Sequence, residues 1–267
     1  MTGIDSVTVI GGTSGIGKAI ALRFAAGRAR VVIAGRDAAR GDGVARDCLA
    51  LGARDACFMA VEIGDPASLT GLARAVDKAF GPPQVLVNCA GILQSGQRVL
   101  DQDLAEDERL WRINYRGTLI GCQVFGRLMR QAGRGAILNV GSLASFAPLS
   151  LPAYTPGKHA VLALTGILAA ELGPHGIRVN AVAPGYTLSD GLKARIAAGE
   201  RDPEAIVSGT ALRKFVAPED VAEAALFLCS DRAASITGVT LPVDAGWLVQ
   251  APYAHYLRGN PVREGAR

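Results

Sequence analysis

Residues 10–18 read Ile-Gly-Gly-Thr-Ser-Gly-Ile-Gly-Lys and join an apolar run, Val7–Ile10, to a segment with helical apolar spacing, Ile16–Ala26. Glycine at these spacings allows a tight turn, close approach of the backbone to a pyrophosphate, and close packing of helix on strand. The amides and dipole of the following helix favour phosphate charge. Surface turns also collect glycine, but the position after the first strand favours a dinucleotide-binding loop. Its expected contacts are Gly11, Thr13, Ser14, Gly15, Ile16 and Gly17.

The rest of the chain continues the same alternation of short apolar runs and helical patterns. Continuous apolar strands between helices predict a parallel sheet covered on both faces, and right-handed crossovers make it doubly wound. We therefore predict an α/β fold with a seven-stranded Rossmann sheet in a single domain, residues 1–267. The expected strands are Val7–Ile10, Arg30–Ala34, Ala56–Val61, Val85–Asn88, Ala136–Val140, Ile177–Ala181 and Val239–Val243. The expected helices include Ile16–Ala26, Leu69–Phe80, Leu110–Met129, Ala160–Leu172 and Pro218–Leu228.

Composition excludes several classes of protein. Hydrophobic residues make up 49% of the chain and charged residues 19%, which provides a core and argues against disorder. No apolar run is long enough to cross a bilayer, and the first residues lack the pattern of an export signal, so we expect a cytoplasmic protein without a membrane partner. The net charge of +4 comes without a basic stripe, so we expect no nucleic-acid partner. The five cysteines form no C-x-x-C pair and only three histidines occur, which predicts buried free thiols and no metal site.

The end of the second strand bears on the choice of cofactor. NAD-binding sheets usually place an acidic residue at this strand's tip, where it binds the adenosine ribose. Here Gly35 occupies the tip and Arg36 follows. An arginine can pair with the 2′-phosphate that only NADP carries. We expect NADP(H), with NAD(H) as the alternative in which Arg36 is a solvated surface charge and Asp37 caps a helix.

Tyr154 and Lys158 open a helical segment and are four residues apart, which puts both side chains on one helix face. An ammonium beside a phenol favours the phenolate, as a general acid/base requires. Ser142 follows the strand Ala136–Val140, at the carboxyl edge where open α/β sheets bind ligands. A Y-x-x-x-K pair is common by chance, but its place after the fifth strand of a nucleotide-binding sheet favours a catalytic role.

Together these motifs resemble the short-chain dehydrogenase/reductase family, from about Val7 to Gly246. The glycine loop, the Asn-Cys-Ala-Gly turn at Asn88, and the terminal Asp-Ala-Gly at Asp244 each have a counterpart in the family's pattern. The segment 180–185, Asn-Ala-Val-Ala-Pro-Gly, resembles the family's segment beside the nicotinamide. Four residues match the catalytic tetrad: Asn114, Ser142, Tyr154 and Lys158.

The resemblance implies a role for each matching residue. Tyr154 is the general acid in reduction or the base in oxidation; Lys158 assists it and binds the nicotinamide ribose. Ser142 polarises the carbonyl, and Asn114 holds a water that links Lys158 to solvent, unless it is an ordinary buried amide. Ser189 is placed to bind the carboxamide, although a serine on the lid surface fits equally well. The remaining expected cofactor contacts are Glu62, Ile63, Asn88, Ala90, Gly91, Pro184, Gly185 and Thr187, and Asn88 also fits a turn-forming role.

Several positions depart from the family's pattern. Ile10 replaces a threonine and Cys89 replaces an asparagine. Glu62 stands where an aspartate usually meets the adenine amine. Pro156 and Gly157 separate Tyr154 from Lys158, and the glycine could loosen the helix that holds them.

Three functions follow from this interpretation. The first is NADPH-dependent reduction of a neutral carbonyl or a 3-oxoacyl substrate. The second is an NAD-dependent dehydrogenase of a sugar, polyol or cyclic alcohol. The third is a non-catalytic nucleotide-sensing protein on the same fold. The complete tetrad argues against the sensor.

Two segments bear on the substrate and on assembly. Residues 188–216 are polar and weakly helical and interrupt the alternation, which predicts a substrate lid. The expected pocket walls, Leu143–Leu151, Gln94–Val99 and Leu188–Leu212, contain no clustered arginines, which favours a neutral substrate. Residues 247–267 form a C-terminal extension, which we expect either to pack on a neighbouring subunit of the homotetramer that the resemblance implies or to be a frayed terminus. Arg98, Arg109, Arg112 and Arg116 could present a basic surface to an acyl-carrier protein.

Overall fold

The computed structural model describes residues 3–259. Its strands form one seven-stranded sheet in which every two neighbouring strands are parallel. The strand order is β3-β2-β1-β4-β5-β6-β7, so the chain reverses direction across the sheet between β1 and β4. Ile10 is in register with Ala34 on β2 and with Asn88 on β4, so the carboxyl ends of these strands meet at one edge. The strands are β1 (Ser6–Ile10), β2 (Arg30–Gly35), β3 (Asp55–Ala60), β4 (Val85–Asn88), β5 (Gly135–Val140), β6 (Ile177–Pro184) and β7 (Thr240–Val243).

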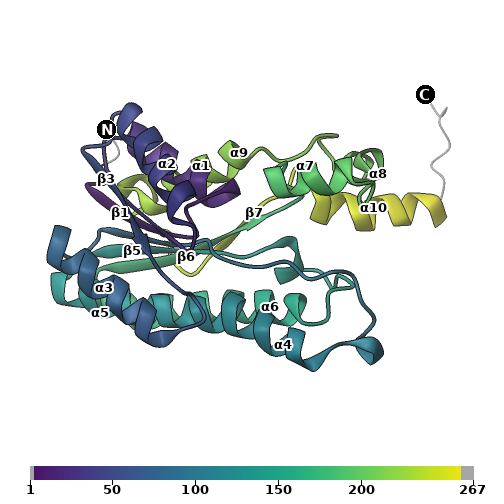
Figure 1. Ribbon diagram of the computed structural model, residues 1–267. Helices are drawn as coiled ribbons and strands as arrows, with labels where there is room; N and C mark the ends of the chain where they lie inside the picture. Colours follow the sequence, from purple (N-terminus) through teal and green to yellow (C-terminus); the bar gives the residue numbers. More distant parts are fainter. Residues whose placement is uncertain (1–2, 260–267) are drawn as a thin grey trace.

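Helices cover both faces of this sheet (Figure 1). One layer holds α1 (Gly15–Ala26), α2 (Ala38–Ala50) and α9 (Pro218–Cys229). The other holds α3 (Pro66–Phe80), α4 (Leu104–Trp111), α5 (Gly117–Ala132) and α6 (Tyr154–Leu172). Beyond the carboxyl edge lie α7 (Asp190–Ala197), α8 (Pro203–Ser208) and α10 (Trp247–Gly259). The single-domain, doubly wound fold is confirmed.

Each helical layer has its own hydrophobic core. Ile20 and Phe24 of α1 pack with β1 and β2 on one face. Phe125 and Met129 of α5 pack with β4 and β5 on the other. The strands between them are buried on both sides, which explains why they read as continuous apolar runs.

Some boundaries differ from the prediction. The helix α2 was not among the ranges expected to be helical, although Asp37 had been considered as a helix cap; α2 buries only Gly41, Val44, Ala45 and Cys48. The helical segment expected to open at Tyr154 and the helix expected over Ala160–Leu172 form one helix, α6, and β6 continues three residues past Ala181. The segment Leu110–Met129 is divided by a π-helical turn, η2 (Arg112–Arg116).

Within residues 3–259, no helix combines the length and the apolar character that crossing a bilayer requires. The C-terminal extension is helical to Gly259, and its last eight residues lie outside the described part of the chain.

Candidate active site

A cavity of about 630 Å³ lies at the carboxyl edge of the sheet, where the strand order reverses. It runs from the glycine loop to the start of α6, with the lid on its other side. The structure brings nearly all predicted site residues to this one cavity. Those that line it are Gly11, Thr13, Ser14, Gly15, Ile16, Gly17, Arg36, Glu62, Ile63, Ala90, Gly91, Ser142, Tyr154, Lys158, Pro184, Gly185, Thr187 and Ser189. Asn88 and Asn114 do not line it.

The glycine loop is held by close backbone packing. A Cβ at Gly17 would lie 2.1 Å from the carbonyl oxygen of Gly11, and a Cβ at Gly11 would lie 2.6 Å from the backbone of Ala90. The first turn of α1 therefore rests directly on the end of β1. Ser14 is the N-cap residue, yet its side chain makes no capping hydrogen bond. The amides of this turn, beside the cavity, thus keep their capacity to bind an anion.

Arg36 is exposed at the end of β2 and lines the cavity. The neighbouring Asp37 caps α2, because its side chain accepts a hydrogen bond from Arg40 N at 3.0 Å. Asp37 also pairs with the Arg40 side chain at 3.2 Å. Arg36 forms no ion pair with any described residue, so its charge stands free at the cavity's edge.

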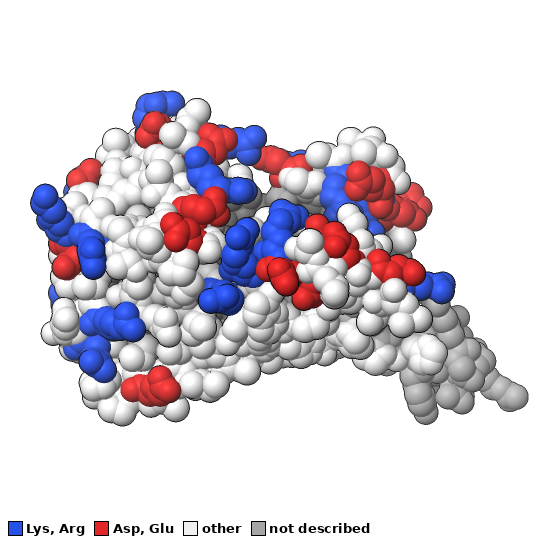
Figure 2. Space-filling model, turned by 60° about the horizontal axis from the view of Figure 1, so that its bottom comes forward, with Lys and Arg blue, Asp and Glu red and all other residues white. Residues whose placement is uncertain are grey.

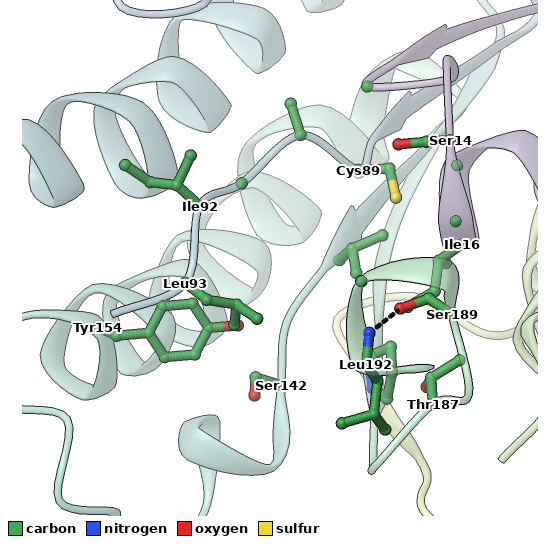
Figure 3. Close-up of a pocket in the computed structure, with 18 of the residues that line it drawn as sticks. Ser14, Ile16, Cys89, Ile92, Leu93, Ser142, Tyr154, Thr187, Ser189 and Leu192 are labelled. Carbon is green, nitrogen blue, oxygen red and sulfur yellow. Dashed lines mark hydrogen bonds between the residues drawn. The ribbon is translucent and has the colours of Figure 1, made fainter. Parts of the chain in front are cut away.

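Tyr154 and Lys158 occupy the first turns of α6, and both are buried. Lys158 Nζ donates to the carbonyl oxygen of Val140 at 2.8 Å and lies 5.6 Å from the centre of the Tyr154 ring. The Tyr154 side chain points into the cavity toward Ser142 (Figure 3). Despite Pro156 and Gly157, α6 is continuous from Tyr154 to Leu172.

Ser142 follows β5 and caps the short 3₁₀ turn η3 (Leu143–Ser145). Its hydroxyl accepts from Ala144 N at 3.2 Å. Ser145 locks this turn to α6, since its hydroxyl accepts from Ser142 N at 3.2 Å and donates to Lys158 O at 2.9 Å. The turn bearing Ser142 is therefore bonded to the helix bearing Tyr154. Sequence reasoning missed Ser145.

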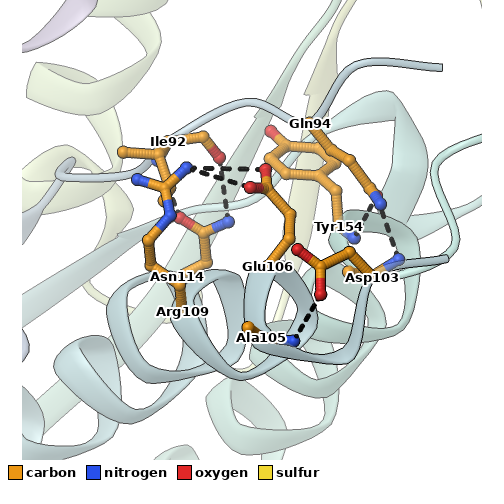
Figure 4. A network of polar contacts seen from close by, with 9 residues as sticks. Ile92, Gln94, Asp103, Ala105, Glu106, Arg109, Asn114 and Tyr154 are labelled. Atoms are coloured by element: carbon orange, nitrogen blue, oxygen red, sulfur yellow. Dashed lines mark hydrogen bonds and ion pairs between the residues drawn. The ribbon is translucent and has the colours of Figure 1, made fainter. Parts of the chain in front are cut away.

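Gln94 fixes the start of α6 (Figure 4). Its Oε1 accepts from Ala153 N at 2.9 Å and from Tyr154 N at 3.0 Å. The side chain is 2% exposed and lines the cavity. Its Nε2 has no hydrogen-bond partner among the described residues. The sequence placed Gln94 in a pocket wall but gave no sign that it holds the backbone of Tyr154.

Asn114 lies in η2, next to the cavity but outside its lining. Its carboxamide makes two hydrogen bonds to Ile92: Oδ1 accepts from Ile92 N at 2.8 Å, and Nδ2 donates to Ile92 O at 3.0 Å (Figure 4). Asn114 thereby ties the segment after β4 to the π-helical turn. The expected water relay to Lys158 stays a prediction.

Asn88 belongs to a buried network rather than to the cavity surface. Its Nδ2 donates to Asn139 Oδ1 at 2.9 Å and to Cys122 Sγ at 3.3 Å. Asn139 Nδ2 in turn donates to Thr165 Oγ1 at 3.0 Å. The network links β4, β5, α5 and α6, so Asn88 supports the neighbouring strand as expected, while direct contact with a cofactor finds no support in its position. Asn139 and Thr165 gave no signal in the sequence.

The predicted lid leaves and rejoins the body at one point. Leu188 N donates to Val216 O at 2.9 Å, and Val216 N donates to Tyr186 O at 3.1 Å. Ser189 caps α7, its hydroxyl accepting from Leu192 N at 3.4 Å (Figure 3). Ser189 thus caps a helix of the lid, and it also lines the cavity, where a cofactor contact was expected.

The pocket walls contain apolar and charged side chains. Leu93, Leu149, Leu151 and Leu192 line the cavity, as expected of an apolar pocket, but Arg195 and Arg201 of the lid line it too. The two residues are six apart in the sequence, and the fold of the lid brings both to the cavity lining. The neutral substrate stays a prediction.

An acidic neighbour partly neutralises the basic surface that was expected from Arg98, Arg109, Arg112 and Arg116. Arg109 pairs with Glu106 at 3.4 Å. On the face shown in Figure 2, basic and acidic side chains are interspersed rather than gathered by sign.

Cys89 also lines the cavity. Burial raises the pKa of its thiol to about 12, although the nearby Lys158 charge acts in the opposite direction. At neutral pH the Cys89 side chain is therefore a neutral thiol. All five cysteines are free; Cys48, Cys122 and Cys229 are buried as expected, while Cys57 and Cys89 are partly exposed.

The chain is similar to several known proteins. Residues 11–248 match the model of a family described as enoyl-(acyl carrier protein) reductase. Galactitol 2-dehydrogenase (L-tagatose-forming) from Cereibacter sphaeroides is 38% identical, over 90% of this chain and 94% of its own length. (+)-Borneol dehydrogenase 2 from Salvia officinalis is 38% identical, over 90% and 87%. The crystal structure of a protein described as a putative 2-deoxy-d-gluconate 3-dehydrogenase from Agrobacterium tumefaciens, with bound NADP, has a TM-score of 0.83 at 32% identity and covers 91% of this chain and 96% of that one.

Proposed function

The chain belongs to the short-chain dehydrogenase/reductase family, and on that premise we propose that it is an NAD(P)(H)-dependent oxidoreductase interconverting a ketone and a secondary alcohol with Tyr154 as general acid/base. The observation that carries this proposal is the placement of Tyr154, Lys158 and Ser142 around one end of a cavity that begins at the glycine loop.

Each of these side chains has a separate task in the reaction. A bound nicotinamide dinucleotide supplies or accepts the hydride. In reduction, the Tyr154 hydroxyl gives its proton to the substrate oxygen; in oxidation, the Tyr154 oxygen takes the proton from the alcohol. The Lys158 ammonium, held by Val140 O at 2.8 Å, favours the negative charge that forms on the phenolic oxygen. The Ser142 hydroxyl donates a hydrogen bond to the substrate oxygen and orients it.

The residues at the other end of the cavity fit a dinucleotide. The uncapped first turn of α1 offers backbone amides to a pyrophosphate. Arg36, which has no ion-pair partner in the described chain, would hold the 2′-phosphate of NADP. We therefore favour NADP(H) over NAD(H). Glu62, which also lines this end, would meet the adenine.

The substrate class follows from the walls near Tyr154. The side chains of Leu93, Leu149 and Leu151 favour a substrate with an apolar body over a free sugar. The relatives named after galactitol and borneol support an alcohol or its ketone as the reacting group. A 3-oxoacyl substrate shares that chemistry. A polyol or cyclic alcohol oxidised with NAD is the second candidate.

We also propose a homotetramer. Val249 and Tyr253 of α10 are 66% and 61% exposed, and Leu241 of the edge strand β7 and Val239 just before it are exposed as well. We expect a neighbouring subunit to cover these apolar side chains. Truncation after Gln250 followed by sizing tests the role of α10, because an unchanged tetramer excludes it.

The test of the function is consumption of NADPH and NADH over a panel of ketones, 3-oxoacyl thioesters and sugar ketones. We expect turnover with NADPH that falls at least a thousandfold in Tyr154→Phe, on the order of the loss when a catalytic acid is removed. Tyr115→Phe is the matched control, since Tyr115 stacks on Trp111 outside the cavity lining. Equal rates in the wild type and Tyr154→Phe, or tight cofactor binding without turnover, would favour the nucleotide-sensing alternative.

A further inference from the structure

Two arginines on the lid face the cavity in which Tyr154 lies. Arg195 belongs to α7, and Arg201 lies between α7 and α8. Both are half-buried. The role proposed above for the cavity uses neither of them.

Both arginines lie away from the point where the lid meets the glycine loop. α7 begins beside the glycine loop, because a Cβ at Gly15 would be 3.6 Å from Ser189 Cβ. Arg195 is six residues further along α7, about 9 Å away at the helical rise per residue. It shares a helix face with Leu192, which also lines the cavity. Arg201 borders in addition a smaller hollow with Tyr186 and Trp247, to which no residue of the glycine loop contributes.

Glu200 and Asp202 border the smaller hollow together with Arg201, but the two arginines differ in the acidic partners that they bind. Arg195 Nε pairs with Glu200 Oε2 at 2.9 Å. Asp202, the carboxylate next to Arg201, accepts from Glu204 N at 2.9 Å and caps α8. Arg201 forms no ion pair with any residue of the described chain. A guanidinium placed half-buried in a cavity wall without a carboxylate partner is suited to an anionic ligand.

We propose that Arg201, assisted by Arg195, binds an anionic group of the substrate, a carboxylate or a phosphate ester, at the end of the cavity opposite the glycine loop. This inference rests on the proposed oxidoreductase function and narrows its substrate to an oxo acid, a hydroxy acid or their phosphorylated counterparts. The apolar walls would hold the carbon chain between the charged group and the reacting carbonyl. Arg201 selects the substrate, while Tyr154 and Ser142 act on it.

The experiment compares acids with their neutral counterparts. We would measure kcat/KM for 4-oxopentanoate and 5-oxohexanoate against their methyl esters, and for hydroxyacetone phosphate against hydroxyacetone. We expect the wild type to prefer one charged class by about tenfold to a hundredfold, the range for a hydrogen bond between charged groups. Arg201→Gln should bring this ratio close to one, mainly through KM. Arg195→Gln should lower the ratio by less, because Glu200 already pairs with Arg195.

Lys193→Ala is the matched control, because Lys193 lies on α7 with a 59% exposed side chain and pairs with Asp190 at 3.8 Å. It should keep the wild-type ratio of kcat/KM for the acid to kcat/KM for its neutral counterpart.

A second experiment titrates the same pairs of compounds onto Tyr154→Phe with NADP, so that binding is measured without turnover. Equal binding of every acid and its ester, or an equal loss for both in Arg201→Gln, overturns the anion site. Weaker NADP binding in Arg201→Gln overturns it as well, by assigning the arginine to the nucleotide. Preferential binding of the acid without turnover in the wild type supports the anion site and overturns the oxidoreductase function instead.

Discussion

The two walls of the cavity are built differently. The frame wall, residues 11–17, 88–94, 140–142 and 154–158, is held by backbone packing and buried hydrogen bonds, with Gly17 against Gly11 O and Gln94 on the start of α6. On the lid wall, residues 188–216, none of the eight described residues of α7 is buried, and α8 buries only Ile206. The lid is tied to the body at its base through Leu188 and Val216, and again through Leu212 N, which donates to Ala245 O at 3.0 Å.

The catalytic residues therefore lie on the rigid frame wall, and the residues that we propose to select the substrate lie on the exposed lid wall. Groups that exchange a proton need fixed geometry, which the buried contacts of the frame wall provide. Groups that choose a substrate can stand on exposed helices, where substitutions cost little stability. The catalytic side chains should therefore tolerate little change around them, while the lid should accept change with altered specificity and an intact fold.

The largest expected effect is the difference in stability between a glycine-to-alanine substitution on the frame wall and one on the lid wall. Gly17→Ala should lower the free energy of unfolding by about 3 kcal/mol or more, because its Cβ meets the backbone of Gly11 at 2.1 Å and neither side can yield. Gly191→Ala should leave stability equal or slightly higher, since the nearest atom is 3.9 Å away and alanine favours a helix. Urea denaturation of both variants measures the contrast. Equal losses would mean that the two walls are packed alike.

Gln94 should show the next largest effect, on catalysis as well as on folding. Gln94→Leu leaves the Ala153 and Tyr154 amides without their acceptor and loosens the turn that aims the phenol. We expect kcat to fall about tenfold to thirtyfold, with a smaller change in KM, the range for buried groups left unpaired. Gln123→Leu on the exposed face of α5 is the control. A loss in KM alone would assign Gln94 to substrate binding.

The sequence predicted the frame wall better than the lid for a physical reason. Glycine spacing, strand ends and the Tyr154–Lys158 interval are set by local geometry, so they can be read in order along the chain. The supporting side chains Ser145, Gln94 and Asn139 could not be read, because their partners are distant in sequence and chosen by packing. The lid arginines were missed for the same reason, since which side of a short exposed helix faces the cavity depends on how the lid folds back. The helix α2 carries few apolar residues, so the capping residue Asp37 was its main local signal.

Alkaline pH should act on the buried network behind the frame wall, through Cys122, which shares hydrogen bonds with Asn88 and Asn139. Burial raises the pKa of Cys122 from 9.0 to about 12, so between these values the unfolded thiol ionises while the folded one stays neutral. Its contribution to stability is complete below pH 9 and is lost as the pH rises toward 12. Between pH 8 and pH 10, the wild type should lose about 1 kcal/mol more than Cys122→Ala. Cys57→Ala, at a partly exposed thiol, should remove less of the pH dependence. Parallel curves for all three proteins would contradict this account.

The smallest effect is expected on the outer face of the lid. Lys193 and Asp190 form an exposed pair at 3.8 Å, a geometry and exposure at which ion pairs contribute about 0.5 kcal/mol or less. Lys193→Ala should therefore leave the unfolding midpoint and the acid-to-ester ratio of kcat/KM within error of the wild type. Arg195→Gln, two residues later on the cavity side of α7, should lower this ratio without changing the midpoint. Such a pair of results from one helix would establish that selection depends on which face of α7 a charge occupies. A change in the ratio from Lys193→Ala would instead mean that the general positive charge of the lid attracts the substrate, and raising the salt concentration would then abolish the preference in the wild type as well.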